Sequence, residues 1–156
     1  MSIRIRVAVI SLMTITLGCG GSMPEGIGVH QAALAPCPDK PNCVSSFATD
    51  ERHQIAALAI SGSSADAWQG LQSVLENDSS AEIERSEAGY LYAIYTSSLM
   101  RYRDDVEFML RDAENEIAVR SASRVGHGDM GVNRSRIEAI RTTLSARGLV
   151  QAAPSE

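Results

Sequence analysis

A glycine-rich segment is the first place in the chain where residue types and spacing could do chemistry. Gly126, Gly128 and Gly131 fit the spacing G-x-G-x-x-G, which in dinucleotide-binding folds sets backbone N–H groups against a pyrophosphate at a helix start. That fold also needs a second parallel strand after the helix and an acidic residue about twenty positions on, and the following residues show neither. We therefore interpret the glycines as permitting a tight loop between a strand and a helix.

The arginines around this loop support a weaker binding hypothesis. Three of them flank it, namely Arg124, Arg134 and Arg136. Free N–H groups at a helix start, helped by guanidinium groups, can hold an anion. The alternative, which we favour, is that these arginines form structural ion pairs with aspartates nearby in the sequence, namely Asp104, Asp105 and Asp129.

Catalytic and metal-binding patterns are weak. Asp104 and Asp105 could bind a cation or act as an acid/base pair, but adjacent residues of a strand point to opposite faces and cannot easily share one site. His127 lies near Asp129 and Ser123, yet no nucleophile elbow accompanies them, so we assign no catalytic triad. The three histidines have no ligand spacing, and we expect no catalytic residue, no metal and no cofactor.

The N-terminus has the layout of an export signal. Arg4 and Arg6 precede an apolar run at positions 7–17, which is shorter than the roughly twenty residues that span a bilayer. Leu17-Gly18-Cys19 resembles the lipobox of bacterial lipoproteins, in which the peptide is cut before a cysteine that becomes a lipid-bearing, acylated N-terminus. We expect residues 1–18 to be a signal peptide and Cys19 to carry the lipid, with palmitate as a typical acyl group. An ordinary cleaved signal peptide is the alternative.

The residues after Cys19 predict a tether. Positions 20–26 contain three glycines and a proline, a composition that favours a flexible chain. We therefore expect residues 19–34 to connect the lipid to the folded body. Gly20, in place of aspartate, resembles the pattern that sorts lipoproteins to the outer membrane. The expected location is a membrane outside the cytosol, and the periplasmic side of the outer membrane in a Gram-negative host.

Two further cysteines fit export. If Cys19 carries lipid, Cys37 and Cys43 remain as a pair in an oxidising compartment, where a disulfide is the expected state. Zinc and redox chemistry are the alternatives. Five intervening residues suit neither the C-x-x-C redox motif nor the usual zinc knuckle, so we favour a structural disulfide.

The elements that must position these residues follow from hydrophobic periodicity. A short apolar run at 55–60 is consistent with a buried strand, and Ser63 with Asp66 opens a helix whose apolar stripe includes Leu71 and Leu75. Strands are predicted at 81–87, 90–97, 105–111 and 116–123, with short connections that favour an antiparallel meander. Asn133 is the expected N-cap of a last helix that Arg147 and Gly148 close.

This order, β-α-β-β-β-β-α, predicts an α+β domain with an antiparallel sheet of about four to five strands and two helices packed on one face. The expected boundaries are 35–148 for the domain and 149–156 for a loose tail. The length of 156 residues fits one such domain.

Three segments in order resemble the family of unknown function DUF1499: CPDKPNCVSS at 37–46, YRDDVEF at 102–108 and RSASRVGHGDMGVNRSRI at 120–137. The resemblance covers roughly residues 35 to 145. It implies a small domain, often exported or membrane-associated, with no established activity. The family commonly has a serine where Gly128 stands, which argues against a hydroxyl role there.

The resemblance also implies a set of polar positions that form either a binding site or an ion-pair network fixing the fold. The cluster of candidate functional residues comprises Asp104, Asp105, Arg120, Ser121, Ser123, Arg124, Asp129, Asn133 and Arg134. Asn42 and Ser45 match the same motifs.

Charge limits the partners. The full chain carries a net charge of -5, and without residues 1–18 it holds 12 basic and 19 acidic residues, a net charge of -7. This balance opposes nucleic-acid binding. The leading hypothesis is a non-enzymatic, lipid-anchored envelope protein that binds a protein partner or a small anionic ligand. The alternative is an envelope hydrolase or transferase that uses Asp104, Asp105 or Asp129 with arginines as stabilisers.

Overall fold

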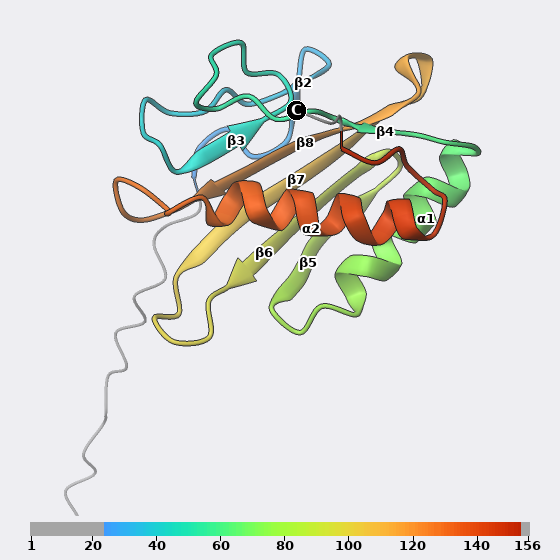
Figure 1. Ribbon diagram of the computed structural model, residues 1–156. Helices are drawn as coiled ribbons and strands as arrows, with labels where there is room; N and C mark the ends of the chain where they lie inside the picture. Colours follow the sequence, from blue (N-terminus) through green and yellow to red (C-terminus); the bar gives the residue numbers. More distant parts are fainter. Residues whose placement is uncertain (1–23, 154–156) are drawn as a thin grey trace, which may run out of the picture.

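The structure is a computed structural model that describes residues 24–153 (Figure 1). The predicted signal peptide and Cys19 lie outside the described residues. The helices are α1 (Ser64–Glu76) and α2 (Val132–Ala146), with a short 3-10 turn η1 (Asp112–Glu114). The strands are β1 (Val29–His30), β2 (Ala33–Leu34), β3 (Cys43–Ser45), β4 (Leu58–Ala59), β5 (Ala81–Glu87), β6 (Tyr90–Thr96), β7 (Arg103–Arg111) and β8 (Glu116–Ser123).

The main sheet is antiparallel and confirms the predicted α+β class. Its strand order is β3-β8-β7-β6-β5, and β4 pairs with the far end of β8. The four consecutive strands β5 to β8 form the expected meander, because each connection is too short for anything but a return to the neighbouring position. Figure 1 shows α1 and α2 on one face of this sheet.

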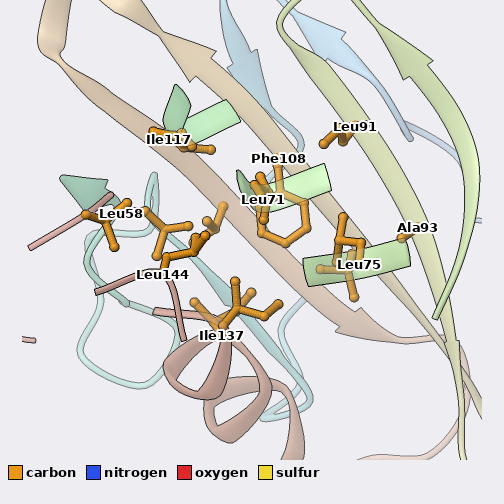
Figure 2. Close-up of a cluster of buried hydrophobic side chains, with 14 of the residues drawn as sticks. Leu58, Leu71, Leu75, Leu91, Ala93, Phe108, Ile117, Ile137 and Leu144 are labelled. Carbon is orange, nitrogen blue, oxygen red and sulfur yellow. The ribbon is translucent and has the colours of Figure 1, made fainter. Parts of the chain in front are cut away.

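The main core lies between that face and the helices. Alternate residues of the strands, such as Leu91, Phe108 and Ile117, point toward Leu71 of α1 and Leu144 of α2 (Figure 2). All five are fully buried. The period of two in the strands and of 3.6 in the helices therefore agree on which residues meet.

The opposite face of the sheet is covered as well. Tyr92 and Met109 belong to a second buried cluster with Leu34, against which Ile27 packs. We predicted residues 24–34 to be part of a flexible tether, and this prediction is wrong for the packed residues. Ile27 and Leu34 provide apolar area that the glycine-rich composition around them conceals, so the segment folds onto the sheet.

The two helices begin differently. Ser63 caps α1 as expected, and its side chain accepts a hydrogen bond from the amide of Asp66 at 3.3 Å. In α2 the predicted N-cap Asn133 already lies inside the helix, and Gly131, with a φ of 80°, occupies the cap position. Asn133 is fully buried, and its side-chain amide forms hydrogen bonds with groups that are distant in the sequence. The prediction that Asn133 is the N-cap is therefore wrong.

The predicted loose tail is ordered in its first part. Val150 is buried, Ile60 forms an isolated bridge with it, and the amide of Gln151 donates to the carbonyl of Ala59 at 2.8 Å. The strand expected at 55–60 is reduced to β4, and the tail pairs beside it. In the part of the chain that the structure describes, all strands, both helices and both buried clusters lie within residues 27–150, so a chain that starts at residue 20 retains this core. No helix within residues 24–153 is long and apolar enough to cross a bilayer.

Candidate functional site

The candidate residues do not converge on one site, because the sheet separates them. Asp104, Ser121 and Ser123 point toward the helices, and Asp105, Arg120 and Arg124 lie on the other face. The register explains this division: Asp105 is opposite Ala122 on β8, and the residues next to each of them in sequence point the other way. Asp104 and Asp105 are thus split between the two faces, as the strand periodicity predicts.

The far face carries a buried ion-pair ladder. Arg124 bonds both carboxylate oxygens of Asp105, its Nη2 lying 2.8 Å from Oδ1, and Arg120 Nη1 donates to Glu107 Oε2 at 3.1 Å. Asp105 and Glu107 are fully buried. The Gly28 amide donates to Glu107 Oε1 at 2.8 Å, so the N-terminal segment closes the ladder. Such pairs fix how the layers meet, since an unpaired buried charge would be strongly destabilising.

Two tyrosines complete the ladder as neutral donors. Tyr90 donates to Glu107 at 2.8 Å and Tyr92 to Asp105 at 2.6 Å. Burial raises the pKa of both hydroxyls far above the ordinary value, and the carboxylates raise it further. The hydrogen bonds that Arg124 donates to Asp105 raise the pKa of Arg124. These groups hold their charge states at neutral pH, which favours a structural role.

A second network lies on the helix face and links β7, β8 and α2. Arg136 Nη2 donates to Asp104 at 2.6 Å, and its Nη1 donates to Ser121 Oγ and to Asn133 Oδ1. Ser121 donates to Asn133 Oδ1 at 2.6 Å. The guanidinium also lies 4.6 Å from the centre of the Tyr95 ring. Arg136 is therefore held by three partners and one aromatic face.

Asp129 occupies the start of α2 that we considered as an anion site. Its carboxylate accepts hydrogen bonds from the amides of Gly131 and Asn133, both at 2.9 Å. Partial burial raises the pKa of Asp129, but these amide hydrogen bonds outweigh it, and the pKa lies below its ordinary value. The protein thus supplies its own anion to the helix N-terminus.

The disulfide loop fastens to the same place. Cys37 and Cys43 form the expected disulfide. Asn42, next to Cys43, donates to the Gly126 carbonyl at 3.1 Å, and its own carbonyl accepts from Asn133 Nδ2 at 3.0 Å. The loop therefore joins β3, the β8–α2 connection and α2. Arg134 lies apart from this network and donates to the carbonyl of Gln54 at 2.7 Å.

A pocket opens beside Asp104 and Arg136, and we call it the loop pocket. It has a volume of about 350 Å³ and lies between the β6–β7 loop, the β5 start and the first turn of α2. Its lining residues are Ser79, Ser80, Tyr95, Thr96, Ser97, Ser98, Arg101, Asp104, Val132 and Arg136. The lining contains five serine or threonine hydroxyl groups in addition to the tyrosine. It also contains two guanidinium groups and only one carboxylate, so the pocket has a net positive charge.

One charged side chain of the loop pocket, Arg101, is available for a ligand. Arg101 forms no ion pair within residues 24–153, and its φ of 55° is held by a loop in which its amide donates to the Ser97 carbonyl at 3.1 Å. The Tyr95 hydroxyl is fully buried and interacts with the Asp78 carboxylate. Burial and the charge of Asp78 raise the pKa of Tyr95, so its hydroxyl is a neutral donor. Neither residue was among the sequence candidates, because their neighbours are set by non-local pairing.

An apolar groove of about 540 Å³ continues from the loop pocket and shares Ser97, Ser98, Asp104 and Val132 with it. Its exposed hydrophobic side chains, which we call the apolar rim, are Leu99, Met100, Tyr102, Met130 and Val132. Ser123 and Asp129 lie at the groove too. Three of the sequence candidates, Asp104, Ser123 and Asp129, therefore border a cavity, and the far-face candidates do not.

The chemistry available here is binding of an anion beside an apolar group. Asp104, the carboxylate at the pocket, is paired with Arg136, and Asp129 is engaged by amides. Both carboxylates are thus occupied, which weakens the hydrolase or transferase alternative. Among the residues from 24 to 153, no group of three or more histidine, cysteine, aspartate or glutamate side chains is placed to hold a metal ion.

The fold defines the structural class of the protein. It is an antiparallel α+β domain with buried ion pairs on both faces of its sheet. The family described as "Protein of unknown function (DUF1499)" matches residues 33–144, and the chain belongs to this family. The match covers most of the expected domain and includes the disulfide loop and both polar networks. No curated protein matches the chain.

Proposed function

We propose that the protein is an exported, lipid-anchored envelope protein that acts by binding a small anionic ligand in the loop pocket, without catalysis. The single observation that carries the binding role is the position of Arg101, which has no ion-pair partner within residues 24–153, in one pocket with Arg136 and five serine and threonine hydroxyl groups. Guanidinium and hydroxyl donors together favour phosphate or carboxylate oxygens.

The polar networks support this proposal by fixing the pocket. Asp104 and Tyr95 hold Arg136 in place, and hydrogen bonds to Ser97 close the loop that carries Arg101. A preformed site loses little conformational entropy when a ligand binds. The export and the lipid on Cys19 rest on the sequence pattern of the N-terminus and on a disulfide, a bond typical of oxidising compartments.

The binding role can be tested by isothermal titration calorimetry on residues 20–156, with inorganic phosphate, glycerol 3-phosphate and citrate as probes. We expect at least one probe to bind at the loop pocket, and Arg101→Ala to weaken it about tenfold or more, because a charged hydrogen bond contributes about 1.5–3 kcal/mol. Arg85→Ala is the matched control, since Arg85 is an exposed arginine outside the pocket. Absence of saturable binding, or equal losses in the two variants, would contradict the proposal.

A further inference from the structure

The apolar rim is unusual for a face left in water. Leu99 is 88% exposed and Met130 is 103% exposed, and together with Met100, Tyr102 and Val132 they surround one groove. Single exposed hydrophobic residues are ordinary, but a contiguous set marks an interaction surface. Five of the six large hydrophobic residues that are exposed within residues 24–153 belong to it, and Val29 is the exception.

Two loop tips present the rim in fixed conformations. Leu99, Met100 and Tyr102 lie on the β6–β7 loop, where the amide of Tyr102 donates to Ser97 Oγ at 2.9 Å. Met130 lies on the β8–α2 loop and has a φ of 53°, a conformation that disfavours a long side chain. The Asp129 carboxylate accepts hydrogen bonds from the amides of Gly131 and Asn133, and these bonds hold the loop in this conformation. Both loops lie at the same end of the sheet (Figure 1).

Basic side chains border the rim. Arg101 and Arg103 flank Tyr102 and form no ion pair within the described range, although the whole chain has a net charge of -5. Apolar tips with adjacent arginines match the chemistry of a bilayer interface, where hydrophobic side chains enter the acyl boundary and cations meet anionic headgroups.

The length of chain outside the described residues points to the same occupant. Pro24 is the first described residue, and the chain enters the fold at the end of the sheet where the two loops lie (Figure 1). Four residues lie between Cys19 and Pro24, and the five residue steps from one to the other span only about 17 Å even when fully extended. If Cys19 carries the lipid, the rim is held close to the membrane surface.

We propose that the apolar rim docks on the surface of an anionic lipid bilayer, so that the folded domain itself contacts the membrane. This inference goes beyond the proposed ligand binding, and its argument from the short tether rests on the proposed lipid anchor at Cys19. The contact adds a second attachment to the anchor at Cys19 and turns the loop pocket toward the headgroups.

The test is co-sedimentation of residues 20–156, which lack the anchor cysteine, with vesicles of phosphatidylethanolamine and phosphatidylglycerol. We expect binding that Leu99→Ser weakens about tenfold or more, with a further loss of similar size for the double variant with Met130→Ser, because each buried side chain of this size contributes strongly to transfer from water. Val29→Ser is the matched control, because Val29 is 42% exposed and does not line the groove. Its binding should equal that of the unchanged chain.

A second measurement does not depend on losing affinity. Leu99→Trp should show a blue shift of tryptophan emission when these vesicles are added, because the indole leaves water. No vesicle binding by the unchanged chain, equal binding by the double rim variant, or an unshifted Leu99→Trp emission would each overturn the proposal. Capture of a protein through the rim without vesicle binding would also overturn it. Phosphate titration of the double rim variant separates this outcome from failure of the loop pocket.

Discussion

At the scale of single residues, each buried carboxylate of β7 has an arginine partner from another part of the fold. Glu107 is paired with Arg120 of β8, Asp105 with Arg124 directly after β8, and Asp104 with Arg136 of α2. The hypothesis of structural ion pairs therefore holds for Arg124 and Arg136. Arg134 does not follow it, because its guanidinium bonds backbone carbonyls at 52 and 54.

Asp129→Asn tests the residue that fastens the start of α2. We expect a loss of about 1–3 kcal/mol of unfolding free energy at pH 7, because charged hydrogen bonds to two amides become weaker neutral ones. The folded pKa is lower than the unfolded one, so this stabilisation is complete above the unfolded pKa and is lost as the pH falls through the folded pKa. Urea unfolding at several pH values should show that the difference in unfolding free energy between the original chain and the variant decreases below about pH 4. A free-energy difference that stays constant down to pH 2 would count against this role.

At the scale of elements, the sequence predicts what is local. The bounds of β5 and β8 match the predicted 81–87 and 116–123, because strand alternation and short turns are local signals. Glu107 was missed for the opposite reason. Its position alternates with apolar residues and suggests a solvent-facing side chain, whereas the segment from Ile27 to Leu34 buries it.

The same limit applies to Asn133. Its neighbours are typical of a helix start, but its partners are the carbonyl of Asn42 and the side chain of Ser121, which are distant in sequence. Only the folded register brings these groups together. The polar positions of the candidate cluster could be found from sequence, whereas their division between two faces and the residues of the loop pocket could not.

Gly70→Ala tests the packing of α1 against the C-terminal end of α2. Helix propensity alone predicts stabilisation of about 1 kcal/mol. A methyl group at this position would collide with the side chain of Leu149, and overpacking costs about 1–3 kcal/mol. We expect net destabilisation in thermal unfolding, and recovery when Leu149→Ala is added. A Gly70→Ala variant more stable than the original would show that Leu149 moves without cost.

At the scale of the whole molecule, one end of the sheet gathers the available chemistry. The loop pocket and the apolar rim adjoin there, and the buried networks on both faces of the sheet hold the elements that carry them. The structural ion pairs therefore lie in the interior of the domain, and the proposed binding surface lies at the loops.

The anchor belongs to this scale as well. Mass spectrometry of the protein recovered from host membranes should find a mature chain that starts at an acylated Cys19. Cys19→Ser should abolish the mass of the acyl groups. A chain that retains Met1, or one without acyl groups, would contradict the anchor and remove the argument for a short tether.

The most direct test of the central claim is a nuclear magnetic resonance titration of ¹⁵N-labelled residues 20–156 with glycerol 3-phosphate. The account predicts saturable amide shifts concentrated at residues 79–80, 95–104 and 132–136, where the loop pocket lies. Arg101→Ala should move their saturation to a concentration about tenfold higher or more. Shifts centred on another region, or no saturable shifts with any of the three anionic probes, would contradict it.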